Sequence, residues 1–144
     1  MSTRSRIIVA NPKGDFTSIY CHYDGYPAGV GKTLLQHYRA KSKVRKLLSL
    51  GDLSSLGVRL EPLFAGHTFD TAERDCTVAY GRDRGTEGTK AVTTPTLREA
   101  VELAADCWAE YVYLFWNGHW SYQTVEDALA RKPFTTLNEG NTTR

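Results

Sequence analysis

Tyr111-Val-Tyr-Leu-Phe-Trp-Asn-Gly-His-Trp-Ser-Tyr-Gln-Thr124 is the stretch that decides the fold. Its two aromatic-rich runs flank Asn117-Gly118, a pair that favours a two-residue type I′ turn because both central positions need a positive φ. The stretch therefore predicts an antiparallel β-hairpin. Trp116 and Trp120 stand beside the turn, where they either pack across the strands or stack on a base or another ligand.

A second hairpin is expected near the N-terminus. The runs 6–10 and 17–23 are rich in β-branched and aromatic residues, and the segment between them holds a Pro and a Gly that suit a turn. Between residues 64 and 95 Gly, Thr and charged residues dominate, and only 75–80 has the composition of a strand. The chain thus offers four or five strands.

Helical spacing of apolar residues predicts the helices. A first helix opens at Pro27 and ends near Arg39, and a second begins with Ser42 as N-cap and stops at Gly51. Thr96 and Glu99 form a capping box, whose helix carries a predicted buried face made of Leu97, Val101, Ala104 and Trp108. A helical turn within 52–57 and a short helix over 125–132 complete the set.

These elements predict one α+β domain over residues 1–134, with a flexible C-terminal tail at 135–144. The expected sheet is antiparallel, has four to five strands including the two hairpins, and carries its helices on one face. No run approaches the roughly 18 apolar residues of a membrane span. The apolar stretch 7–10 is too short for a secretory segment, so we expect a cytoplasmic protein.

The sequence gives no indication of a metal or cofactor. Three Cys and four His are dispersed along the chain, without the paired spacing of a disulfide framework or a zinc site. We therefore expect neither a metal site nor a cofactor.

Charge is unevenly distributed. The net charge of +2 conceals +7 over residues 1–51 and −5 over the remainder, and the segment 25–51 holds six basic residues and no acid. Either the two halves attract one another within the fold, or a basic surface binds nucleic acid or an acidic partner. The candidate basic surface consists of Arg39, Lys41, Lys43, Arg45 and Lys46.

Gly31-Lys32-Thr33 suggests a phosphate-binding loop, but the spacing is wrong. A P-loop needs Gly six positions before the Lys, and that position is Tyr26, with the nearest glycine one residue too early. The extra residue changes which backbone amides converge, so we reject nucleotide hydrolysis. The segment is then a helix entry, with a weaker alternative in which Lys32 and amides near it hold an anion.

Two further polar clusters are candidate binding sites. His22, Asp24 and Tyr26 precede the first helix, and Gly81-Arg82-Asp83-Arg84-Gly85 places two guanidiniums on a glycine-bounded loop, where they suit phosphate or carboxylate. Alternatively, the arginines pair with nearby carboxylates to hold loops. Convergence of these residues on an open pocket would favour a ligand, and mutual burial a structural role.

Four strings resemble a family of small, largely uncharacterised proteins encoded by bacteriophages and prophages. They are Ile19-Tyr-Cys-His-Tyr-Asp-Gly-Tyr-Pro-Ala-Gly-Val-Gly31, Leu34-Leu-Gln-His-Tyr38, Leu50-Gly-Asp-Leu-Ser-Ser-Leu-Gly57 and Ala79-Tyr-Gly-Arg-Asp-Arg-Gly85. The similarity spans about residues 4–122. It implies an accessory protein at work in the bacterial cytoplasm, where such proteins often bind and divert a host component.

The leading hypothesis is a non-enzymatic binding protein in host takeover or anti-defence. The basic surface and the Arg82/Arg84 loop would engage a bacterial host protein or a nucleoprotein complex, with nucleic acid itself as a further partner. Two alternatives stay open. One is a protein that sequesters a small molecule or nucleotide, whose phosphates Lys32, Arg82 and Arg84 would hold. The other is a metal-dependent nuclease that uses His67, Asp70 or Asp83.

Overall fold

The centre of the sheet is a parallel pair of strands, β1 (Ser5–Ala10) and β6 (Tyr111–Trp116). A computed structural model describes residues 2–143 of the chain. Its sheet has eight strands in the order β4-β3-β2-β1-β6-β7-β8, with β5 also paired to β2. The other strands are β2 (Phe16–Cys21), β3 (Leu53–Ser55), β4 (Val78–Ala79), β5 (Val92–Thr94), β7 (His119–Thr124) and β8 (Thr135–Thr136).

The α+β class is confirmed, but the predicted sheet is too small and its purely antiparallel pairing is wrong. Both β1 with β6 and β2 with β3 are parallel. Parallel neighbours cannot be joined by a tight turn, and the helical segment between residues 27 and 49 supplies the crossover from β2 to β3. The strand predicted at 75–80 is present as the shorter β4. The added strands β3, β5 and β8 have only two or three residues each, too few for a recognisable alternation.

Both predicted hairpins are confirmed. β6 pairs antiparallel with β7, and Asn117 and Gly118 between them adopt φ values of 53° and 78°, as a type I′ turn requires. β1 pairs antiparallel with β2 across the predicted Asn11–Asp15 turn.

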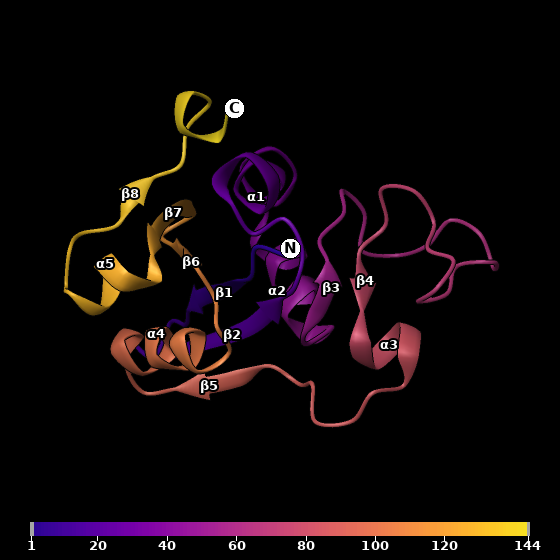
Figure 1. Cartoon of the computed structure of the whole chain (residues 1–144), viewed down its shortest axis with the longest axis horizontal. Helices are drawn as coiled ribbons and strands as arrows, with labels where there is room; N and C mark the ends of the chain where they lie inside the picture. The colour runs from indigo at the N-terminus through magenta and orange to yellow at the C-terminus, as the bar shows by residue number, and fades with distance from the viewer. Residues whose placement is uncertain (1, 144) are drawn as a thin grey trace.

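Helices cover both faces of the sheet, which corrects the prediction of one covered face (Figure 1). Ile7 and Ile8 are adjacent in β1 and point to opposite faces, yet both are fully buried. Ile7 packs in a core with Leu34 of α1 (Lys32–His37) and Leu47 of α2 (Lys41–Ser49). Ile8 packs in a second core beneath α4 (Leu97–Asp106) and α5 (Val125–Leu129).

The four longer predicted helices are present, with local corrections. Thr96 is confirmed as the N-cap, since its hydroxyl accepts a hydrogen bond from the Glu99 amide at 3.1 Å. The Glu99 carboxylate contacts the Thr96 hydroxyl at 3.2 Å rather than the Thr96 amide of a full capping box. The first helix starts as a π-helical turn, Pro27–Gly31, and continues into α1. The N-cap of α2 is Ala40 rather than Ser42, and Trp108 lies beyond the end of α4 with its side chain exposed.

Two segments differ in type from the prediction. The expected helical turn at 52–57 is instead strand β3, held by pairing to β2 and β4. The expected loop at Gly81–Gly85 is mostly helix α3 (Tyr80–Arg84), and Gly85 ends it with a left-handed φ of 74°. In both places tertiary pairing and local hydrogen bonds override a weak local signal.

The C-terminal segment, for which a flexible tail is predicted, carries ordered contacts. β8 pairs with β7, and Leu137 is buried in the core beside α1. A short 3-10 turn, Gly140–Thr142, follows. Across residues 2–143, no helix has the length and apolar character needed to cross a membrane.

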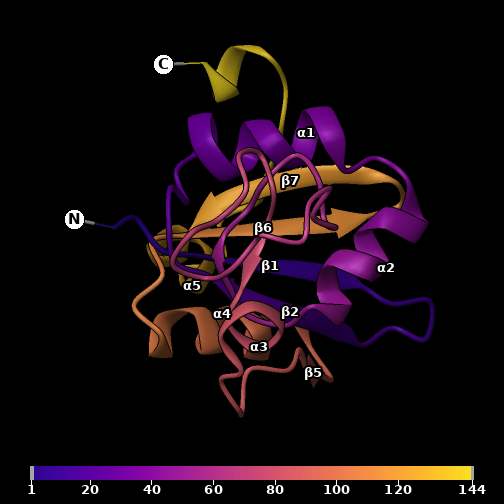
Figure 2. The same cartoon turned by 90° about the vertical axis from the view of Figure 1, so that its right-hand side faces the viewer.

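One end of the sheet brings three segments together (Figure 2). Because β1 and β6 are parallel neighbours, with Val9 beside Phe115, the turns that follow them emerge at the same end. These are the β1–β2 turn at 11–15 and the β6–β7 turn at 117–118. α2 lies over this end of the sheet.

Candidate functional site

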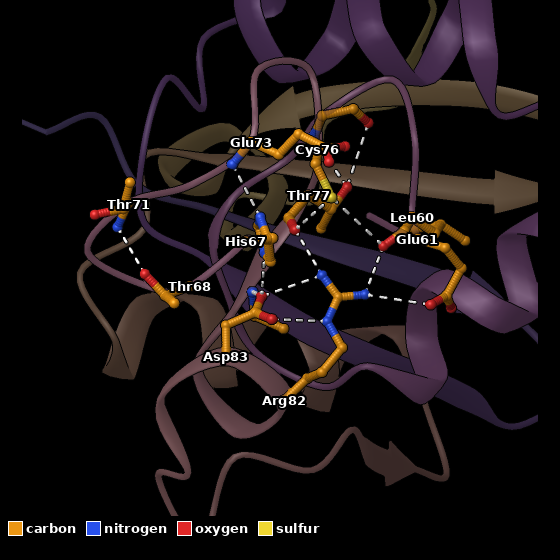
Figure 3. A network of polar contacts seen from close by, with 12 residues as sticks. Leu60, Glu61, His67, Thr68, Thr71, Glu73, Cys76, Thr77, Arg82 and Asp83 are labelled. Atoms are coloured by element: carbon orange, nitrogen blue, oxygen red, sulfur yellow. Dashed lines mark hydrogen bonds and ion pairs between the residues drawn. The ribbon is translucent and has the colours of Figure 1, made fainter. Parts of the chain in front are cut away.

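Arg82, a predicted ligand-binding residue, is occupied by contacts within the protein (Figure 3). Its guanidinium donates to the carbonyl oxygens of Leu60 and Thr77 at 2.5 and 2.7 Å. It also forms two hydrogen bonds with Asp83, of 2.9 and 3.1 Å. The side chain is 24% exposed, and its planar set of donors is directed inward. Arg82 therefore fastens α3 to the neighbouring segments that contain Leu60 and Thr77.

The loop that Arg82 fastens spans residues 60–76 and is called the long loop here. Its ends meet where Arg59 and Cys76 form an isolated bridge. Within it, the Glu73 carboxylate pairs with Arg59 and accepts hydrogen bonds from the amides of Leu63 and Phe64. The long loop is thus organised by charged side chains rather than by regular structure.

His67 and Asp83 meet beneath the long loop. His67 Nδ1 accepts a hydrogen bond from the Glu73 amide at 3.0 Å, so in the neutral ring Nε2 carries the proton. Nε2 lies 3.2 Å from Asp83 Oδ2, but the N–H is not aimed at that oxygen, which makes the contact chiefly electrostatic. The two side chains are only 2% and 5% exposed.

Asp83 is held in its charged form. Burial by itself raises the pKa of a carboxyl group, but hydrogen bonds from Arg82 and the Ala79 amide and the contact with His67 outweigh burial and lower the pKa of Asp83. The cluster of Arg82, Asp83 and His67 is therefore a closed electrostatic unit, and it leaves no open face on which a substrate could contact the carboxylate.

Arg84 of the predicted arginine loop and Asp70 of the alternative nuclease site lie apart from the cluster. Arg84 lies over the Phe69 ring, 5.1 Å from its centroid, and Asp70 is exposed. Within residues 2–143, no group of three His, Cys, Asp or Glu side chains is arranged to hold a metal ion.

Asp24 and Lys32 share a separate hollow of about 250 Å³ beside α1, which neither Arg82 nor Arg84 lines. The two arginines therefore do not share this hollow with Asp24. Tyr26 immediately precedes the π-helical turn. His22 contacts Tyr20 through Nδ1 at 2.5 Å, and burial and then Arg4 lower its pKa.

Backbone amides near Lys32, proposed above as an anion site, donate to carbonyls within the protein. The Val30 amide donates to the Asp24 carbonyl at 2.8 Å, and the Lys32 amide donates to the carbonyls of Gly29 and Pro27. The glycine-rich segment is thus a helix entry, and the alternative of an anion site built from these amides loses its donors.

The predicted basic surface divides into two groups. Arg39 and Lys43 donate to carbonyls at the C-terminal end of α1, Leu35 at 3.1 Å and His37 at 2.8 Å. Lys43 also donates to the Val58 carbonyl at 2.9 Å and lies 4.2 Å from the centroid of the Tyr38 ring. These two cations stabilise the turn between α1 and α2.

Lys41, Arg45 and Lys46 form the second group. All three are exposed on α2, and they have no ion pair with any acid in the described chain, residues 2–143. Because nothing inside the protein neutralises them, their field is directed to solvent. These three side chains, called the free basic face below, are what remains of the predicted surface.

Two members of the free basic face, Lys41 and Arg45, line a hollow of about 380 Å³ at the sheet end. Its other walls include the ends of β1 and β6, with Trp116, and the two turns described above, with Pro12. The sequence marks the cations and, separately, Trp116 as candidates for binding, but it does not show that they line one groove. Only the parallel pairing of β1 with β6 brings the turns beside α2.

The two tryptophans of the hairpin differ in exposure to solvent. Trp120 is 4% exposed, packs against Phe115 with ring centroids 4.9 Å apart, and donates its indole N–H to the Tyr38 carbonyl at 2.7 Å. Trp116 is 63% exposed. Trp120 thus takes the cross-strand packing role, and Trp116 is the one available for stacking.

Comparison with known proteins finds no matching family model, no matching curated protein and no matching solved structure.

Proposed function

We propose that this chain is a non-enzymatic accessory protein of the bacteriophage type that binds a negatively charged host component in the bacterial cytoplasm. Host takeover or anti-defence is the biological role that such binding would serve. The proposal keeps the leading hypothesis from the sequence but changes the residues that carry it. The free basic face, which is part of the predicted basic surface, carries the binding without Arg39, Lys43 or the Arg82/Arg84 loop.

The observation that carries the proposal is the set of uncompensated cations on α2. Lys41, Arg45 and Lys46 project from one short helix in a segment, 25–51, that contains no acid. Surface cations in proteins are usually interspersed with acids, and a cluster of one sign attracts partners of the opposite sign. A partner rich in phosphate or carboxylate groups fits this surface.

The two alternatives have less support. A nucleotide held by Lys32, Arg82 and Arg84 would need those three side chains to meet, and they lie in different places. A nuclease built on His67 and Asp83 would need substrate access to a pair that is almost fully buried.

The test is recovery of host components from a bacterial lysate by the tagged protein. The triple variant Lys41→Glu/Arg45→Glu/Lys46→Glu should lose the partner that the wild-type protein captures, because attraction becomes repulsion. The control variant Arg74→Glu/Lys90→Glu/Arg131→Glu makes the same change in net charge at exposed residues outside α2 and outside the hollow at the sheet end, and it should retain the partner. Equal recovery by all three proteins would refute the proposal.

A further inference from the structure

The hollow at the sheet end, called the groove here, is lined by both cationic and aromatic side chains. Lys41 and Arg45 provide positive charge on one side, and Trp116 provides an exposed aromatic surface on the other. Its volume of about 380 Å³ falls within the roughly 300–1,000 Å³ typical of ligand sites. The groove is thus large enough for a flat group and its attached charge.

Trp116 lies where this groove meets a second one. The second hollow, about 420 Å³, lies along β6 and β7 and is lined by Leu114, His119 and Phe134 among others. Trp116 and Asn117 line both hollows. The alternation of side chains along β6 explains this position. Phe115 packs in the core on the α2 side of the sheet, and Leu114 packs in the core on the opposite side. Trp116, the last residue of the strand, lies on the same side as Leu114. A path around the sheet end therefore passes over Trp116.

Neither hollow is lined by an Asp or a Glu. Asp15 and Glu139 each lie three residues along the chain from a lining residue, Pro12 and Thr136 respectively. The Asp15 carboxylate accepts a hydrogen bond from the Asn11 side chain at 2.9 Å. The path is therefore positive at one end, aromatic in the middle, and free of acidic lining throughout. An anionic chain with flat aromatic groups complements it.

From this complementarity we infer that the groove binds single-stranded nucleic acid, with a base stacked on Trp116 and backbone phosphates held by Lys41 and Arg45. The inference rests on the proposed function and names its partner. Single strands are favoured over duplexes because the bases of a duplex are already stacked on one another, whereas an unpaired base presents its face to an aromatic side chain. An acidic protein would satisfy the cations but has no comparable need for the indole.

The test measures binding of a fluorescein-labelled 12-nucleotide oligo(dT) strand by fluorescence anisotropy at low salt. Trp116→Ala should weaken binding about fivefold or more, because one stacked base contributes on the order of 1–3 kcal/mol. Trp116→Phe should keep most of the affinity. The control Trp108→Ala removes another exposed tryptophan, one that lines neither hollow, and should leave affinity unchanged.

The cations are tested by salt dependence. Lys41→Ala/Arg45→Ala should weaken binding and flatten the dependence of log K on log salt, since fewer counterions are released. Trp116→Ala should leave that slope unchanged, because stacking releases none. This separation distinguishes a composite site from general attraction to a polyanion.

Several results would overturn the inference. Binding that is insensitive to Trp116→Ala, or equal affinity for the matching duplex, would show attraction by charge alone. If no oligonucleotide binds while lysate capture still depends on the free basic face, the partner is an acidic protein; the inference then fails and the proposed function stands. If capture is also independent of that face, both fail.

Discussion

The Arg82–Asp83–His67 cluster and the groove at the sheet end are both built from residues that the sequence marks as candidates for binding. They differ in where their charges are satisfied. In the cluster every charge has a partner inside the protein, and the imidazole and carboxylate are nearly inaccessible. In the groove Lys41 and Arg45 have no acidic partner in the described part of the chain, residues 2–143, and Trp116 is exposed.

The comparison teaches that charged residues bounded by glycines are not by themselves evidence for a ligand. The cluster uses its charges to fasten the long loop, which lacks regular structure and whose backbone carbonyls need donors. α2 needs no such help on its outer face, because its own hydrogen bonds satisfy its backbone. Its outward cations are therefore available for a partner.

The largest expected effect is the loss of stability when the cluster is broken. Asp83→Ala leaves the Ala79 amide without its acceptor and removes the carboxylate that pairs with Arg82. It should lower the free energy of unfolding by about 3 kcal/mol, near the lower end for a broken buried pair because Arg82 is partly exposed. Urea denaturation measures the loss. Arg84→Ala, which removes only the contact with Phe69, serves as the control and should cost under about 1 kcal/mol. Similar costs for the two variants would mean that the cluster is not a structural unit.

A smaller effect should appear when the cluster is titrated. The folded state lowers the pKa of Asp83 below its usual 3.8, so ionised Asp83 stabilises the protein above that value, and the stabilisation is lost as the pH falls through the folded pKa. The stability difference between wild type and Asp83→Asn should therefore be constant above about pH 5 and narrow below pH 4. Urea denaturation of both proteins over this pH range measures the difference. The pKa of Glu73 is also lowered, but Glu73 is present in both proteins, so its contribution cancels in the difference. A difference that widens toward acid would contradict the assignment.

The smallest effect distinguishes two lysines on the same helix. Lys43→Ala removes hydrogen bonds to the His37 and Val58 carbonyls and the contact with Tyr38, and should cost about 1–2 kcal/mol. Lys41→Ala should change stability by no more than about 0.5 kcal/mol, as for an unpaired surface residue. Thermal unfolding compares the two. Equal costs would show that the division of the basic surface into structural and free groups is wrong.

The elements with strong local signals were predictable. Asn117-Gly118 requires a type I′ turn whatever surrounds it, and Thr96 with Glu99 begins a helix through contacts three residues apart. These interactions operate between residues a few positions apart, so the amino-acid sequence alone is enough to recognise them.

The second covered face of the sheet also had a signal in the sequence. Ile7-Ile8-Val9 and the run 112–115 are continuously apolar, which is typical of strands buried on both faces. A half-exposed antiparallel sheet would instead alternate apolar and polar residues. The parallel pairing of β1 with β6 joins segments about a hundred residues apart, and no local pattern encodes it.

The sequence by itself determined the two hairpins, the principal helices and the inventory of cations and aromatics, because each depends on neighbouring residues or on composition. Only the tertiary structure decided which charges are available. Arg82 and Lys43 are engaged by carbonyls that lie far away in the chain or across a turn, whereas Lys41, Arg45 and Trp116 meet at one groove because two parallel strands end side by side. Whether a charge is paired depends on long-range contacts, and these exist only once the sheet has formed.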